Sequence, residues 1–255
     1  MISLNRISAD DDPLLLWTAQ NMRTGARAWA HGDAAAVACR GVSRRDRLAL
    51  RGGPDDVAEL VRRIRPQLTG FHPVADESLI DALAERIDGF EVVARIGWMD
   101  TTTPALAPLP DPPIPVPERP GTERLSGGPC WLAEDELGEV TALLEAEHPG
   151  SWAQPGTPGV RRWAGLRDQD GALLAVGADA WSVPEIGFVA GVATRVRARG
   201  RGLGTALCAF LTDELIKDRD RVALLVDRTN VAAVRTYERL GYRMRPIAAA
   251  RLTPV

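Results

Sequence analysis

Glycines and arginines alternate in one short stretch, Arg195 to Thr205, which reads RVRARGRGLGT. Because glycine has no Cβ, the backbone N–H groups around Gly200, Gly202 and Gly204 can approach a ligand closely. A run with apolar residues at helical spacing follows, and a helix N-terminus adds unpaired N–H donors and a partial positive charge. The arginines would add charge-assisted hydrogen bonds to phosphate oxygens. The stretch therefore predicts an anion site suited to phosphate.

Two familiar phosphate motifs do not fit this stretch. A P-loop needs a lysine after its glycines, but Lys217 is the only lysine and stands in the charged run IKDRDR. A dinucleotide fingerprint, G-x-G-x-x-G, fails because Thr205 and Leu207 occupy the positions of the last glycine. The pattern present is R-x-x-G-x-G, from Arg199 to Gly204.

A second motif follows some 26 residues later and reads N-x-x-A-x-x-x-Y-x-x-x-G-Y, from Asn230 to Tyr242. The two motifs together resemble the GCN5-related N-acetyltransferase (GNAT) superfamily, over about residues 130–250. The whole chain, with a GWMD strand before a proline-rich stretch, is similar to the FR47-like branch.

The resemblance implies transfer of an acetyl group from acetyl-CoA, a co-substrate, to an amine that attacks directly in a ternary complex. It implies Tyr237 as the acid that protonates the leaving thiolate, since a phenol with a pKa near 10 can donate to a thiolate whose acid is near 8.5. It places an oxyanion donor on the strand near Val192. The acetyl-CoA residues that it implies are Val192, Ala193, Thr194, Arg199, Gly200, Arg201, Gly202, Leu203, Gly204, Thr205 and Asn230.

The general base is an open choice at this stage. Glu185 begins the strand that leads to the glycine turn, where the superfamily often places a glutamate, although strand parity or a bulge could aim it elsewhere. His148 precedes a Gly/Pro-rich loop, 148–159, that would border the acceptor site. Trp152 in that loop either lines the acceptor pocket or anchors the loop.

The sequence on either side of these residues predicts the helices and strands that position them. The spacing predicts a helix over 134–147 and a hairpin on either side of 169–171. A strand is predicted over 185–195, ahead of the glycine turn, and its helix follows. Beyond them we expect a strand over 221–227, a helix from Asn230 to the stop at Gly241, and a last strand near 244–253.

The first hundred residues repeat part of that order. A hairpin over 26–41 and a strand over 46–52 precede a helix from Pro54, a helix from Glu77 and a strand from Phe90. At the equivalent strand-to-helix junction, 51–56, the residues are RGGPDD, without R-x-x-G-x-G, and two aspartates would repel a pyrophosphate. The repeat predicts two tandem GNAT-like α/β domains, each a mixed, mostly antiparallel sheet flanked by helices, the first degenerate.

The domain boundary is predicted at residues 103–121, which hold eight of the nineteen prolines and favour an extended linker or strap. The domains are then 1–102, a degenerate GNAT-like domain without cofactor, and 122–255, the N-acetyltransferase domain.

Composition limits the other function classes. A net charge of −3 argues against a nucleic-acid partner, and no apolar run is long enough for a membrane span. The start has no secretory pattern, and the three cysteines form neither a disulfide framework nor a metal site, so a cytoplasmic protein is expected. Three alternatives stay open: a longer acyl group, a non-catalytic acyl-CoA-binding regulator, and a basic surface for RNA or protein. The expected acceptor is a small-molecule or peptide amine; the sequence leaves its identity and the oligomeric state open.

Overall fold

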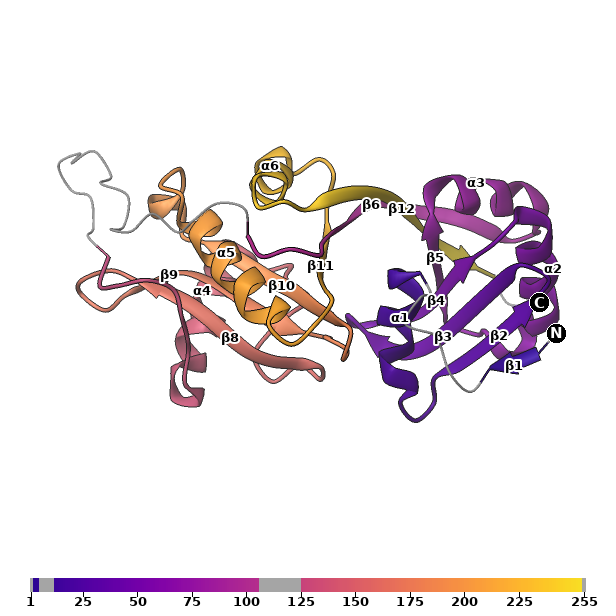
Figure 1. Cartoon of the computed structure of the whole chain (residues 1–255), viewed down its shortest axis with the longest axis horizontal. Coiled ribbons are helices and arrows are strands. Elements are labelled where there is room, and N and C mark those ends of the chain that lie inside the picture. The colour runs from indigo at the N-terminus through magenta and orange to yellow at the C-terminus, as the bar shows by residue number, and fades with distance from the viewer. Residues whose placement is uncertain (1, 5–11, 106–124, 254–255) are drawn as a thin grey trace.

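The computed structural model describes residues 2–4, 12–105 and 125–253. It shows one mixed twelve-stranded sheet with helices packed on its faces in two lobes (Figure 1). Most of the predicted linker at 103–121 lies outside the described residues. We call β1 to β6 the first half and β7 to β12 the second half.

In the first half the short strand β1 and helix α1 precede a three-stranded meander. Asp12 caps α1, since its carboxylate accepts the N–H of Leu14 at 2.8 Å. The elements in order are β1 (Ile2–Leu4), α1 (Pro13–Ala19), η1 (Gln20–Met22), β2 (Arg27–His31), β3 (Ala34–Val42), β4 (Arg45–Arg51), α2 (Pro54–Ile64), η2 (Arg65–Gln67), β5 (His72–Asp76), α3 (Glu77–Arg86) and β6 (Phe90–Thr101).

The second half repeats the same succession of strands and α-helices. Its elements are β7 (Cys130–Trp131), η3 (Glu134–Glu136), α4 (Leu137–Glu147), β8 (Val160–Arg167), β9 (Leu173–Ala180), β10 (Ile186–Thr194), η4 (Val196–Ala198), α5 (Leu203–Ile216), β11 (Arg221–Val226), α6 (Val231–Arg239) and β12 (Arg243–Leu252).

The two halves exchange their last strands. The sheet order is β1-β2-β3-β4-β5-β12-β6-β11-β10-β9-β8-β7, so β12 pairs with β5 of the first half and β6 pairs with β11 of the second. β6 and β12 also pair with each other along their length, from Phe90 opposite Leu252 to Asp100 opposite Arg243 (Figure 1). The sheet therefore runs through both lobes without an edge between them.

Parallel pairing occurs at only two places among the described strands, β4 with β5 and β10 with β11. The β10–β11 pairs join Ile186–Phe188 to Arg221–Ala223. Beyond these three pairs, β10 stays paired with β9, and β11 stays paired with β6. The carboxyl ends of β10 and β11 therefore part, and no described strand pairs with the end of β10 on that side. The carbonyl of Thr194, the last residue of β10, accepts the Nε–H of Arg199 at 3.0 Å.

The predicted elements around the motifs are confirmed within a few residues, and so is the mixed sheet with flanking helices. Helix α1 and strand β5 were not predicted. Both are short, at seven and five residues. Three aspartates stand directly before α1, and β5 (HPVAD) contains a proline, so neither segment shows a clear helix or strand pattern in the sequence.

An aromatic cluster joins the halves on one face of the sheet. The ring of Trp17 in α1 stacks on Phe188 in β10, with centroids 4.5 Å apart and planes at 18°. The same indole meets Trp98 of β6 edge-on at 5.7 Å. All three side chains are buried, so this core belongs to neither half alone.

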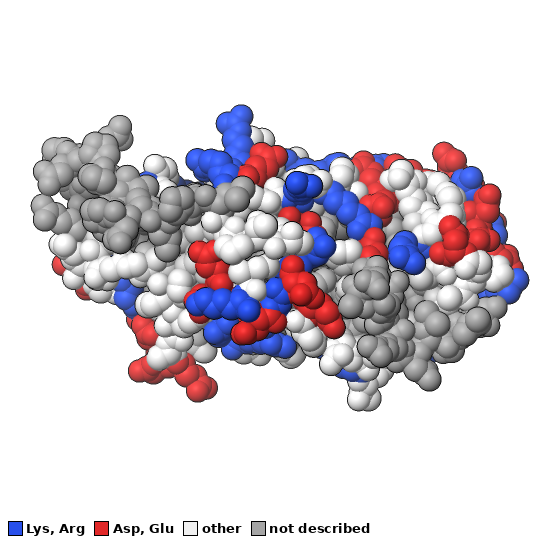
Figure 2. Space-filling view, in the orientation of Figure 1, with Lys and Arg blue, Asp and Glu red and all other residues white. Residues whose placement is uncertain are grey.

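Positive and negative side chains are interleaved over the face drawn in Figure 2, without a broad field of one sign. Within the described residues, no helix has the length and hydropathy that crossing a membrane requires.

Replacing Trp17 by alanine removes the ring that contacts both halves. We expect Trp17→Ala to lower the free energy of unfolding by about 3–5 kcal/mol, and Trp17→Phe, which keeps a ring on Phe188, to cost less. Urea denaturation followed by far-UV circular dichroism and by fluorescence measures this. Both probes should report one shared transition; two separate transitions would contradict a core common to both halves.

Candidate active site

Strand β10 carries a bulge close to its carboxyl end. Its register with β9 shifts between Ala190 and Ala193, and Gly191 has a φ of +64°. A Cβ on Gly191 would lie 2.6 Å from the indole of Trp163 and 3.1 Å from the side chain of Ala153. Only glycine fits there, and the bulge turns backbone groups near Val192 away from the regular ladder.

The glycine turn leads directly into helix α5. Gly200 and Gly202 have φ values of +74° and +77°, and Gly202 is the N-cap residue. A glycine cap offers no side chain to the first N–H groups of the helix, which point outward with the positive end of the helix dipole. A Cβ at Gly200 would meet no atom within 4 Å, so the approach to the turn is open. This is the geometry of an anion site.

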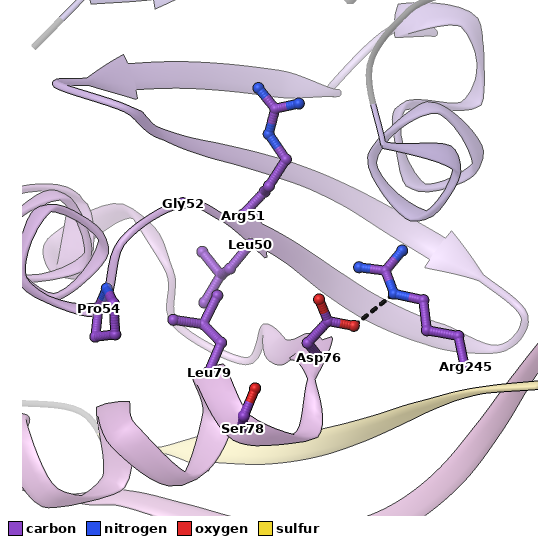
Figure 3. A pocket seen from close by; sticks show the side chains of 8 residues that line it. All are labelled: Leu50, Arg51, Gly52, Pro54, Asp76, Ser78, Leu79 and Arg245. Atoms are coloured by element: carbon purple, nitrogen blue, oxygen red, sulfur yellow. Dashed lines mark hydrogen bonds and ion pairs between the residues drawn. The ribbon is translucent and has the colours of Figure 1, made fainter.

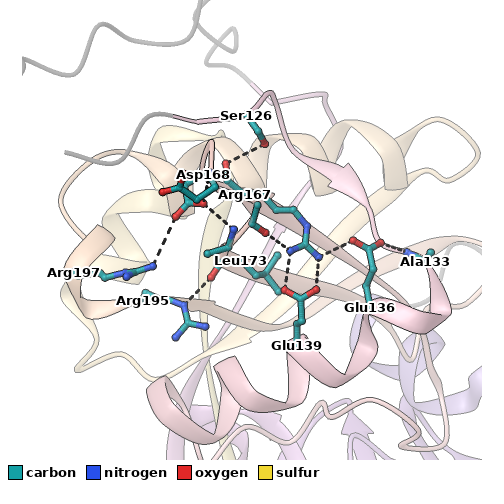
Figure 4. Close-up of polar contacts among 12 residues, drawn as sticks. Ser126, Ala133, Glu136, Glu139, Arg167, Asp168, Leu173, Arg195 and Arg197 are labelled. Carbon is teal, nitrogen blue, oxygen red and sulfur yellow. Dashed lines mark hydrogen bonds and ion pairs between the residues drawn. The ribbon is translucent and has the colours of Figure 1, made fainter. Parts of the chain in front are cut away.

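Carboxylates hold the arginines of this turn. Glu147, the last residue of α4, accepts the N–H of Val196 at 3.1 Å and pairs with Arg199 at 3.3 Å. The Nη2 atom of Arg197 lies 3.8 Å from a carboxylate oxygen of the buried Asp168 (Figure 4). These contacts fix the turn, and any phosphate bound there competes with Glu147 for Arg199.

The other end of α4 is tied to β8 by Arg167. Its guanidinium donates to Glu139 at 2.8 and 3.0 Å and to Glu136 at 2.6 Å (Figure 4). The pKa of Glu139 is lowered mainly by the hydrogen bond from Arg167. For Glu136 the hydrogen bond from the Ala133 N–H lowers the pKa most, followed by Arg167. Both glutamates are solvated, so the contact chiefly orients α4.

Both tyrosines of the chain lie against α5. Tyr237 of α6 is buried and lies in the same core cluster as Cys208 of α5. Desolvation raises the pKa of Cys208 to about 12 and raises the pKa of Tyr237 well above its usual value. The hydroxyl of Tyr242 lies 2.8 Å from Thr212, and its ring is 5.7 Å from that of Tyr237.

The structure brings the glycine turn and the end of β10 together, as predicted from the sequence. It does not bring Glu185 to them, because Glu185 precedes β10 while Val192 lies near its other end. At about 3.3 Å per residue the two are some 20 Å apart. Asn230 is the N-cap of α6, with its side-chain oxygen accepting the N–H of Ala233 at 3.1 Å.

The loop 148–159 lies beside the bulge and touches the first half. Ala153 faces Gly191, and Trp152 next to it is 42% exposed. The guanidinium of Arg47, from β4, lies 5.7 Å from the Trp152 ring and 5.2 Å from Trp17. Arg47 is buried, its Nη2 has no hydrogen-bond partner, and desolvation lowers its pKa to about 10. His148 is the C-cap residue that follows α4, and it is exposed.

The equivalent gap in the first half, between β4 and β5, is built differently. Only two residues separate β4 from helix α2, which has Pro54 at its first position, and Asp33 accepts the N–H of Gly53 at 3.0 Å. A cavity of about 250 Å³ opens there (Figure 3). On its wall the Nε–H of Arg245, from β12, donates to a carboxylate oxygen of Asp76, with Nε and Oδ1 2.5 Å apart.

A family model described as FR47-like protein matches residues 165–251, which include the bulge, the glycine turn, both tyrosines and most of β12. The chain belongs to the FR47-like branch of the GNAT superfamily. It is 33% identical to the mycothiol acetyltransferase of Salinispora arenicola over 215 residues, 72% of this chain and 63% of that protein. The mycothiol acetyltransferase of Salinispora tropica is 32% identical over the same shares. The chain thus spans about 63% of the length of these relatives.

Solved structures of the superfamily share the fold. A GCN5-related N-acetyltransferase from Kribbella flavida superimposes with a TM-score of 0.59 at 19% identity, covering 88% of each chain. A GNAT-family acetyltransferase from Colwellia psychrerythraea gives 0.52 at 14% identity, covering 91% of this chain and 88% of that one. At these identities the likeness describes the whole α/β architecture of both halves and no particular chemistry.

Sequence reasoning missed the groups that support this GNAT site from a distance. Glu147 and Asp168 are ordinary acidic residues of a helix end and a hairpin. Arg47 stands in a strand with alternating charges. None of the three carries a local signal, because each acts through contacts far along the chain.

Proposed function

We propose that this GNAT protein transfers an acetyl group from acetyl-CoA to the amine of a small molecule. The observation that carries the proposal is the junction of β10 and α5. There a parted strand end, a bulge and an uncapped helix N-terminus meet within some fifteen residues. The relatives named mycothiol acetyltransferase support a small-molecule amine as acceptor.

Each part of acetyl-CoA has a counterpart at this junction. The pyrophosphate would bind the N–H groups that open α5, with Arg199 and Arg201 beside them. Pantetheine would pair with the backbone edge of Val192 to Thr194, as an added strand does, and would replace the Arg199 Nε–H that the Thr194 carbonyl accepts at 3.0 Å. The thioester would then lie at the bulge, where a backbone N–H can stabilise the oxyanion.

The transfer proceeds by direct attack. The neutral amine nitrogen gives its lone pair to the thioester carbonyl carbon, and the carbon–sulfur bond breaks with its electron pair on sulfur. Tyr237 gives its proton to this thiolate, and the proton lost by the amine passes to water and returns to the phenolate. The amine needs a base or a water chain to take its proton, since most alkylamines are protonated near pH 7. Glu185 lies about 20 Å along the strand from Val192, beyond the reach of a hydrogen bond or of one water, so we propose a water chain to solvent for that proton.

The first half would serve as a degenerate tandem domain without acetyl-CoA. Its strand-to-helix junction is short, Pro54 offers no N–H, and Asp33 already accepts from Gly53. Its contribution would be to close the acceptor side, where Arg47 meets Trp152 of the loop. Such a protein fits a reducing cytoplasm, because Cys39, Cys130 and Cys208 are all free thiols.

One observation favours a second candidate, a non-catalytic acyl-CoA-binding regulator. Tyr237 is only 8% exposed, and its ring packs in the core 5.7 Å from that of Tyr242. A tyrosine that only packs α6 on α5 would show the same contacts. Both candidates predict that the protein binds acetyl-CoA, but only the acetyltransferase predicts turnover.

Gly202 provides the test of binding. Gly202→Glu places a carboxylate at the expected pyrophosphate position and should weaken acetyl-CoA binding about 10- to 100-fold in calorimetric titration. Gly202→Gln is the matched control, because it carries the same backbone strain and nearly the same bulk without the charge. Equal affinity for the glutamate variant and the wild type would place acetyl-CoA elsewhere.

Tyr237 provides the test of turnover. Tyr237→Phe removes the proton donor but keeps the ring, so we expect kcat to fall about 100-fold or more while the acetyl-CoA dissociation constant changes little. Release of CoA in the presence of a panel of small amines measures this. If the wild type and Tyr237→Phe both bind acetyl-CoA and neither acetylates any of the amines, the result favours the regulator.

A further inference from the structure

A buried cation without an anionic partner lies on β4. Arg47 is 3% exposed, and its Nε–H donates to the carbonyl of Val42 at 3.1 Å. Its Nη2 has no hydrogen-bond partner, and no carboxylate in the described part of the chain forms an ion pair with it. Burial lowers its pKa to about 10, which still leaves the guanidinium charged at neutral pH. An unpaired charge in the interior costs free energy that an incoming anion would recover.

Two indole rings contact this guanidinium. Its Cζ lies 5.2 Å from the ring centre of Trp17 and 5.7 Å from that of Trp152. Such cation–π contacts orient a guanidinium through its flat face and leave the N–H groups at its edge for a planar anion. Trp17 is buried, and its Nε1 also has no hydrogen-bond partner, whereas Trp152 is 42% exposed. A ligand would therefore reach Arg47 from the side of Trp152.

The loop that carries Trp152 also connects Arg47 to the bulge of β10. Ala153, the next residue, lies so close to the bulge that a Cβ on Gly191 would be 3.1 Å from its side chain. The path from Gly191 through Ala153 and Trp152 to Arg47 is at most about 20 Å long, so the straight line between its ends is shorter. A small acceptor whose amine lies at the bulge, where the thioester is expected, can extend toward Arg47.

We propose that Arg47 selects the acceptor, by pairing with the carboxylate of a small molecule that carries both an amine and a carboxylate. This inference rests on the proposed function, since it names the acceptor class of the same transfer. The Nη2 of Arg47 would donate to a carboxylate oxygen, a charge-assisted hydrogen bond that is stronger in a buried place than at the surface. A neutral amine would leave the buried cation unpaired and would therefore bind less well.

Acceptors that differ in charge alone test the proposal. ω-Amino acids of increasing chain length are compared with their primary amides, and release of CoA from acetyl-CoA is measured. At the best chain length we expect the wild type to prefer the carboxylate about 10- to 100-fold in kcat/KM. Arg47→Met should abolish this preference by lowering kcat/KM for the carboxylates. Its kcat/KM for the amides and its dissociation constant for acetyl-CoA should stay within about twofold of the wild-type values.

Arg45→Met is the matched control. Arg45 belongs to the same strand and lies 5.4 Å from the same Trp152 ring, but it is exposed. Water and salt screen its charge, so the preference for carboxylates should change less than about twofold. Urea denaturation checks that Arg47→Met is folded. If it is not, Arg47→Gln takes its place, because glutamine removes the charge but keeps a donor for the carbonyl of Val42.

Calorimetric titration of the same compounds in the presence of CoA measures acceptor binding without turnover. A wild type that neither binds nor acetylates the carboxylates better than the amides would overturn the inference, and acetylation of the amides would leave the proposed function standing. A preference for carboxylates that survives in the folded Arg47 variant would also overturn it. If carboxylates bind through Arg47 but no amine releases CoA from bound acetyl-CoA, the proposed transfer and the role of Arg47 in acceptor choice both fall.

Discussion

The crossed pair of strands β6 and β12 is the constraint on which the rest of the molecule depends. Each strand completes the sheet of the other half, and each is hydrogen bonded on both sides. Neither half has a complete sheet without the other, because β5 of the first half pairs with β12 of the second, and β11 of the second half pairs with β6 of the first. The geometry of the β10–α5 junction is therefore tied to residues more than a hundred positions away.

That constraint explains why the two halves differ in detail while sharing an order of elements. Both contain a parallel pair whose strands part at one end. In the second half a bulge and a long glycine turn fill the space before α5. In the first half α2 follows at once, and Asp33 uses the N–H of Gly53. The same architecture thus presents an anion site in one half and a closed helix start in the other.

Much of this could be predicted from the sequence, because the decisive features are local. Gly202 and Gly204 mark the turn, Asn230 caps its helix as expected, and the hairpin around 169–171 forms. The exchange of β6 and β12 could not be predicted, since period and propensity give strands but not their partners. Nor could the contacts of Glu147 with Val196 and Arg199, which join elements remote in sequence. The role of Glu185 was inferred from its place before the strand, and strand length sets it far from Val192.

Hydrogen–deuterium exchange with and without acetyl-CoA tests the central claim most directly, because it reads both junctions in one experiment on the whole chain. The account predicts slowed exchange at residues 190–206, where the backbone of β10 and the first turn of α5 would bind the ligand, and no change at residues 50–58. Slowed exchange at 50–58, or none at 190–206 under saturating acetyl-CoA, would contradict it.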